Sequence, residues 1–242
     1  MSKLKSIRDI SNIIYAVANW DEDPNAMREK FRKAIEPKYY PQVYRALVDL
    51  ITAMAKGRTY EWALAQAKLL TEEMVQNATV SALKVLKPHF ENRTIDWFLN
   101  DLPKHEFQAS ADVKIPVKIF GVIKDQNGLH LVVLCHWKKA LSTKQLRILA
   151  SLVKYYAEQY PELAEANLEM VDLSCVGKHR TLKVHTWNTL ELLSSNELNE
   201  VMKGMADAYL WAVSDFEANP TSPRKKPKKP KDRKTGDLFP EP

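Results

Sequence analysis

Glycine is scarce in this sequence, and the motifs that depend on it are missing. Six glycines occur in 242 residues, and none forms a GxGxxG pattern or a P-loop, whose backbone groups cradle phosphates. The GxSxG and HExxH patterns of common hydrolase sites do not occur either. These absences disfavour a nucleotide-dependent enzyme and leave no standard motif of these classes to anchor a catalytic site.

Long apolar runs are also missing. No window approaches the ~20 uninterrupted apolar residues of a membrane-spanning helix, and charged and amide residues interrupt the first seventeen positions, where a signal peptide would be uniformly apolar. The chain has only two cysteines, Cys135 and Cys175, without metal-ligand spacing, and we expect two buried, reduced thiols. The sequence thus predicts a cytoplasmic protein, associated with the nucleoid in a bacterial host, or a nuclear protein in a eukaryotic host.

The positive charge is concentrated at the C-terminal end. The net charge is +6, and residues 219–242 hold eight Lys and Arg and three Asp and Glu. Subtracting these from the totals of 36 and 30 leaves 28 basic and 27 acidic residues in positions 1–218, so the body is nearly neutral. Beyond Asn219, prolines alternate with lysines and no apolar period remains. We therefore predict a disordered segment over 219–242, called the basic tail below.

Helical periodicity and helix-terminating residues predict that the first hundred residues are mainly helical. Asp23 and Pro24 supply a cap and a first-turn proline. Gly57 supplies a left-handed stop, and Pro88 is expected to end a long helix that begins at Thr59. The predicted helices cover about 7–17, 24–35, 41–56 and 59–86.

From about Gln108 the apolar period changes from helical to alternating, which predicts strands. The pair Asn127–Gly128 between two apolar runs predicts a tight hairpin. The run Leu131–Cys135 is apolar on both faces, as in a central strand that is covered on both sides. The expected strands are 113–121, 129–135, 168–173 and 182–187.

Two capping boxes mark helices among these strands. Ser142 and Gln145 begin a helix to about residue 160, and Ser194 and Glu197 begin one to about residue 215. The predicted fold is α/β (α+β), with a helical N-terminal half followed by a mixed sheet flanked by helices. We expect a helical extension over 1–58, an α/β domain over 59–218 and the basic tail over 219–242.

Two short segments carry a family resemblance. Phe120-Gly121-Val122-Ile123 precedes the predicted hairpin, and His136-Trp137-Lys138 follows its second strand. Together with the element order, they resemble the PD-(D/E)XK nuclease superfamily over roughly residues 60–190. In that superfamily a carboxylate on the second strand and a D/E-x-K pair on the third would bind Mg²⁺ and activate water.

The resemblance implies a restriction-endonuclease-like fold with His136 and Lys138 at the catalytic positions. His136 stands where the acid should be, and apolar residues occupy the place of the metal-binding aspartate. The resemblance therefore implies an inactive version of the fold that binds no cofactor. A plainer interpretation of His136 and Lys138 is a strand end that reaches solvent.

Two alternatives remain open from the sequence. The first is an active Mg²⁺-dependent nuclease that acts on DNA and takes its carboxylates from Glu72, Glu73, Asp112 or Asp125. The second is a protein-binding module without enzymatic activity, one subunit of a larger assembly that it contacts through its helical half.

The basic tail is the clearest binding signal. A cationic run of this kind gains affinity for phosphate backbones by releasing counterions, without reading sequence. The alternatives are a solubilising tail or, in a eukaryote, a nuclear localisation signal. The predicted nucleic-acid-binding residues are Arg224, Lys225, Lys226, Lys228, Lys229, Lys231, Arg233 and Lys234.

A candidate docking motif follows the basic run. Asp237, Leu238 and Phe239 resemble the end of the peptides that bind bacterial sliding clamps, in which a Leu-Phe pair fills an apolar pocket. Two apolar anchors in an otherwise polar segment are what a short docking motif requires. The expected partners are therefore nucleic acid and a protein of the sliding-clamp kind.

Overall fold

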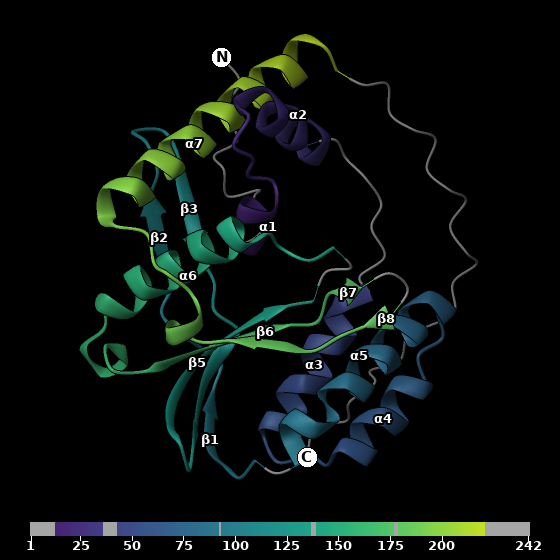
Figure 1. Cartoon of the computed structure of the whole chain (residues 1–242). Helices are drawn as coiled ribbons and strands as arrows, with labels where there is room; N and C mark the ends of the chain where they lie inside the picture. Colours follow the sequence, from purple (N-terminus) through teal and green to yellow (C-terminus); the bar gives the residue numbers. More distant parts are fainter. Residues whose placement is uncertain (1–12, 36–42, 92, 137–138, 177–178, 221–242) are drawn as a thin grey trace.

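The computed structural model describes residues 13–35, 43–91, 93–136, 139–176 and 179–220. Its first part is helical up to residue 91, as the sequence predicts, and its second part holds the strands (Figure 1). Among the described residues, no helix is both long and apolar enough to cross a membrane. The first five helices are α1 (Ile13–Ala18), α2 (Pro24–Ile35), α3 (Val43–Ala55), α4 (Tyr60–Lys68) and α5 (Glu73–Glu91).

Local chemistry explains where these helices begin and end. The Asp23 carboxylate accepts the backbone N–H of Asn25 at the start of α2, and Thr59 Oγ1 accepts the N–H of Trp62 at the start of α4. Gly57 follows α3 with φ of +94°, a conformation that suits glycine.

The prediction of a single long helix from Thr59 to Leu86 is wrong. The chain forms α4 and α5 instead, with a break between Lys68 and Glu73, and Pro88 lies inside α5 rather than beyond its end. A proline removes one helix hydrogen bond. Leu83 and Leu86 are fully buried in the preceding turns, and this packing keeps the helix intact to Glu91.

The main sheet has five strands in the order β1-β4-β5-β6-β9, with β5 and β6 parallel and the other neighbours antiparallel. The predicted hairpin is confirmed, because Asp125 pairs with Gly128 across two turn residues, and Gly128 has φ of +114°. The strands are β1 (Ile95–Leu99), β4 (Gly121–Asp125), β5 (Gly128–Cys135), β6 (Asn167–Asp172) and β9 (Lys183–His185).

Two strand expectations are corrected. The strand expected over 113–121 is divided between β3 (Lys114–Val117), which pairs with β2 (His105–Gln108) in a separate ribbon, and β4. Strand β1 lies within the region that was expected to be helical. Its sequence is too short to show a period, and it becomes a strand by pairing with β4.

Helices cover both faces of the sheet, and β5 shows the division. Leu131, Val133 and Cys135 point into a core shared with α1, α6 (Thr143–Glu158) and α7 (Ser195–Ala218). Val132 and Leu134 point into a second core shared with α3, α4 and α5. Figure 1 shows the two helical groups on opposite sides of the sheet. The central, doubly covered strand is therefore confirmed, as are the capping boxes that begin α6 and α7.

Short elements complete the connection from β6 to α7. The strands β7 (Cys175–Val176) and β8 (His179–Arg180) form a small ribbon between β6 and β9. The 3-10 turns η2 (Pro161–Leu163) and η3 (Trp187–Thr189) precede β6 and α7. Trp187 Nε1 donates to the Ala166 carbonyl over 2.9 Å, which ties the segment after β9 to the start of β6.

Gly121 should be intolerant of any side chain. A Cβ atom at this position would lie 2.8 Å from the Leu99 carbonyl oxygen on β1 and would overlap the Phe98 ring. We expect Gly121→Ala to lower the free energy of unfolding by about 1–3 kcal/mol, measured by urea denaturation.

Gly204→Ala in α7 is the matched control for this substitution. Its nearest contact is Met27 Cε at 3.9 Å, and an alanine inside a helix should add up to about 1 kcal/mol of stability. Equal effects of the two substitutions would contradict the close approach of β1 and β4.

Candidate functional site

A buried cluster of charged side chains lies between α5 and the sheet. It consists of His89, Arg93, Asp125, His130 and Glu169, called the Arg93 network below. His89 is on α5, Arg93 follows α5, and the other three residues lie on β4, β5 and β6. Asp125 and Glu169 are on the sheet face that packs against α3, α4 and α5, because they alternate with residues of the opposite core.

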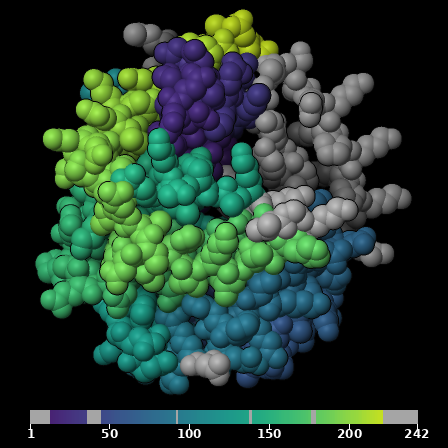
Figure 2. Space-filling view, in the orientation of Figure 1, coloured from purple at the N-terminus to yellow at the C-terminus, as the bar shows by residue number. Residues whose placement is uncertain are grey.

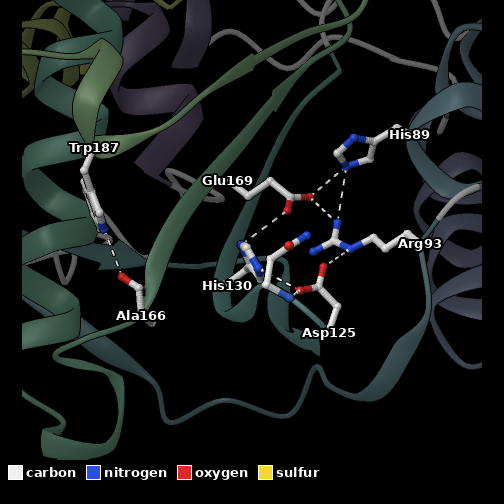
Figure 3. Close-up of polar contacts among 8 residues, drawn as sticks. His89, Arg93, Asp125, His130, Ala166, Glu169 and Trp187 are labelled. Carbon is white, nitrogen blue, oxygen red and sulfur yellow. Dashed lines mark hydrogen bonds and ion pairs between the residues drawn. The ribbon is translucent and has the colours of Figure 1, made fainter.

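One guanidinium joins the two carboxylates. Arg93 Nε lies 2.7 Å from Asp125 Oδ2, and Arg93 Nη1 lies 2.7 Å from Glu169 Oε1. Figure 3 shows Arg93 between the two acids, with a histidine beside each of them. The chain therefore places its own cation between two buried carboxylates of the sheet.

The two histidines complete the pairing of the carboxylates. His89 Nε2 lies 2.8 Å from Glu169 Oε1, and His130 Nε2 lies 3.0 Å from Asp125 Oδ1. The backbone N–H of Asn127 also donates to Asp125 Oδ1 over 2.8 Å. Within the described residues, the network has one buried side-chain nitrogen or oxygen without a hydrogen-bond partner, Arg93 Nη2.

The network holds both acids in their charged form. Burial acts to raise the pKa of the Glu169 carboxyl, but hydrogen bonds and charges from His89 and Arg93 outweigh it and lower the pKa to about 2. For Asp125, burial again opposes ionisation, and the Asn127 N–H and the Arg93 charge lower its pKa below the usual value. Burial acts to lower the pKa of Arg93, but the two acids raise it overall.

This arrangement suits structure better than catalysis. The oxygen atoms that a hard cation such as Mg²⁺ would need are already bound to a guanidinium and two imidazoles. In the part of the chain that the structure describes, no group of three or more His, Cys, Asp or Glu side chains is arranged to hold a metal ion. The network instead fastens the end of α5 to three neighbouring strands.

The predicted catalytic position lies at the other end of β5. His136 follows Cys135, six residues from His130, a separation of about 20 Å along a strand. Burial lowers the pKa of His136 to about 4, and the nearby Arg180 charge acts in the same direction, so the ring is neutral near pH 7. Arg180 Nη1 donates to the carbonyls of His136 and Leu173 and joins the ends of β5 and β6. Lys138 lies outside the described residues.

The structure separates the carboxylates of the alternative nuclease site. Glu72 and Glu73 are exposed at the start of α5, and Asp112 is exposed between β2 and β3. Asp125 is buried and paired with Arg93. The expectations for Arg224 to Lys234 and for Asp237, Leu238 and Phe239 fall outside the described residues, so they stay predictions.

The expectation of two buried, reduced thiols is confirmed in part. Both are free, but only Cys135 is buried, whereas Cys175 on β7 is half-buried. Burial and the nearby Asp172 charge raise the pKa of the Cys135 thiol.

No protein-family model matches this chain, and no curated protein matches it either. The residues themselves are therefore the basis for any functional argument.

Acid unfolding should report on Glu169. The pairing with His89 and Arg93 lowers the pKa of its carboxyl from the ordinary value of 4.5 to about 2 in the folded chain. The folded state therefore gains stability above pH 4.5 that is lost as the pH falls toward 2, an effect of roughly 3 kcal/mol. We expect Glu169→Gln to be less stable at pH 7 and to lose part of this acid dependence, measured by urea unfolding from pH 2 to 7.

Glu72→Gln, which removes an exposed carboxyl outside the Arg93 network, is the control. It should unfold like the parent chain at every pH. A Glu169→Gln chain whose stability curve stayed parallel to that of the parent would contradict the assigned role of the network.

Proposed function

We propose that this chain is a nucleic-acid-associated accessory protein without nuclease activity, held on its target by the basic tail. The observation that carries the proposal is the separation of charge. The tail holds eight of the 36 basic residues against three acids, while positions 1–218 are nearly neutral. Phosphate backbones attract such a segment regardless of base sequence.

The body supports the accessory role through the Arg93 network. When the separate β2–β3 ribbon is left aside, the element order α5, β1, β4, β5, α6, β6 agrees with the helix, three strands, helix and strand of the resemblance to PD-(D/E)XK nucleases. Of the three buried carboxylates of the sheet, Asp125 and Glu169 are paired with Arg93 and Asp172 accepts hydrogen bonds from Ser174, and His136 takes the place of the acidic residue. A fold of this kind can position nucleic acid or a partner without cleaving it.

The tail residues take two roles in this proposal. Arg224 to Lys234 contact phosphates, and Asp237, Leu238 and Phe239 dock on a protein partner such as a sliding clamp. The protein then acts where nucleic acid is found, in the cytoplasm of a bacterium or the nucleus of a eukaryote.

Charge removal in the tail should weaken nucleic-acid binding. We expect Lys225, Lys226, Lys228 and Lys229, all changed to Gln in the full chain, to weaken binding to a fluorescent DNA duplex at least tenfold, measured by anisotropy. For the parent chain, a plot of the logarithm of affinity against the logarithm of salt concentration should have a negative slope. Its magnitude should be about 0.9 for each phosphate contacted, and therefore about 7 at most. The slope should be shallower in the Gln variant.

The same four residues changed to Arg form the matched control, because this keeps the charge and should keep both affinity and salt slope. Unchanged binding by the Gln variant would overturn the tethering role.

The same preparation of the full chain is used to test for DNA cleavage. Linear duplex and single-stranded DNA should stay intact with Mg²⁺ or Mn²⁺ present. If the parent chain cuts DNA and Lys138→Ala does not, the active nuclease is correct and the accessory role is wrong.

A further inference from the structure

Strand β1 forms one edge of the main sheet. It pairs with β4, and in the described part of the chain no strand lies on its other side. In an antiparallel pair, alternate residues turn their N–H and C=O groups toward the neighbouring strand, so the other residues of β1 turn theirs outward. Among the described residues, no backbone hydrogen bond from a turn, loop or cap reaches residues 95–99. Such an edge is a template for a further strand.

The exposed face of β1 is apolar. Trp97 and Leu99 are 43% and 45% exposed, whereas most large apolar side chains of the described residues are buried or half-buried. Both lie on one face of the sheet, because Leu99 pairs with Val122 and Trp97 pairs with Lys124, two residues apart on β4. Val122 points into the core shared with α1, α6 and α7. The exposure of Trp97 and Leu99 therefore means that these helices do not extend fully over β1.

The two edges of the sheet differ in how well they resist a further strand. The opposite edge, β9, has three residues and an exposed lysine, Lys183, and both features are common protections of sheet edges. On β1, a bulge between Ile95 and Trp97 and the charge of Asp96 disturb the first half of the strand. Residues 97–99 have neither protection. Pairing through one open edge favours a closed pair of copies over a growing chain, which needs two open edges.

We propose that this protein dimerises through β1, which pairs antiparallel with β1 of a second copy about a two-fold axis at Phe98. In this register Trp97 lies opposite Leu99 of the second copy, and Asp96 lies opposite Asn100. Each exposed apolar side chain meets another, and each carboxylate meets an amide rather than a second carboxylate. An axis at Trp97 would instead set Asp96 opposite Phe98. The sequence of β1 thus complements itself best about Phe98.

The interface is small, so the dimer is weak. Five strand residues from each copy bury much less than the roughly 1,600 Å² of a standard protein–protein interface. We expect a dissociation constant on the order of 10 μM. The copies therefore exchange readily, and the fraction of dimer depends on the concentration of the chain.

The dimer goes beyond the proposed function and does not depend on it. Figure 2 shows α2 in purple and the end of α7 in yellow at the top of the molecule, whereas β1 lies in the lower part of Figure 1, which has the same orientation. The residue at which the basic tail begins is therefore remote from the paired edge. Two tails on one dimer would bind a single nucleic acid with higher avidity than one tail.

Sedimentation velocity of the full chain, without nucleic acid, tests the association. Between about 1 and about 200 μM we expect a reversible change from monomer to dimer. A monomer at every concentration would overturn the proposal. Species that keep growing beyond the dimer would overturn the closed two-fold pair.

Charge substitutions at two exposed positions test the register. Asn100→Asp sets a carboxylate opposite Asp96 at both ends of the pairing and should raise the dissociation constant about three- to tenfold. Adding Asp96→Lys to Asn100→Asp sets opposite charges against each other, and this double variant should dimerise as well as the parent chain. A double variant no tighter than Asn100→Asp alone would contradict the register.

Asn196→Asp, at an exposed position near the start of α7, is the matched control. It changes the net charge by the same amount away from β1 and should leave the dissociation constant unchanged. Equal weakening by Asn196→Asp and Asn100→Asp would show a general charge effect and overturn the β1 contact. Unchanged melting temperatures at low concentration serve as the folding control for all variants.

Hydrogen exchange of residues 95–99 locates the contact directly. Protection of their amides should increase with the concentration of the parent chain and increase less for Asn100→Asp. Protection that is already complete in the monomer would show that a segment of the same chain covers this edge, and the proposal would fail. If the chain dimerised but bound no DNA, the proposed function would fail and the dimer would stand.

Discussion

The pairing of Arg93 with Asp125 and Glu169 is the interaction on which the arrangement of α5 and the sheet depends. Both acids are buried, and a buried charge without a partner costs several kcal/mol. Compared with well-packed apolar residues of similar volume, the intact network adds little stability, because desolvation offsets much of the attraction. Its effect is on geometry, since α5, β4, β5 and β6 must meet in one relative position for all five side chains to be paired. The same neutralisation keeps the acids from serving as metal ligands.

The sequence predicts the parts of this fold that local chemistry decides. The hairpin at Asp125–Gly128 and the capping boxes of α6 and α7 depend on neighbouring residues, and the structure confirms them. Strand β1 and the break between α4 and α5 were missed, because long-range pairing and packing decide them. The Arg93 network was missed for the same reason, since its members lie up to 80 residues apart. One local signal existed: His130 and Glu169 are polar residues within apolar strands.

Charge is distributed along this chain in a way that its total conceals. Within a nearly neutral body, α7 carries five carboxylates and one lysine, and the basic tail follows its last residue in sequence. A net charge of +6 therefore describes neither segment.

The unequal burial of the two thiols has a practical consequence for spectroscopy. Burial raises the pKa of the Cys135 thiol, so little thiolate forms there, whereas Cys175 is only half-buried on the ribbon that follows β6. A maleimide dye or nitroxide added to the folded protein will therefore attach at one site without mutagenesis. That label reports on the edge where β5 and β6 end, near His136, and leaves the Arg93 network undisturbed.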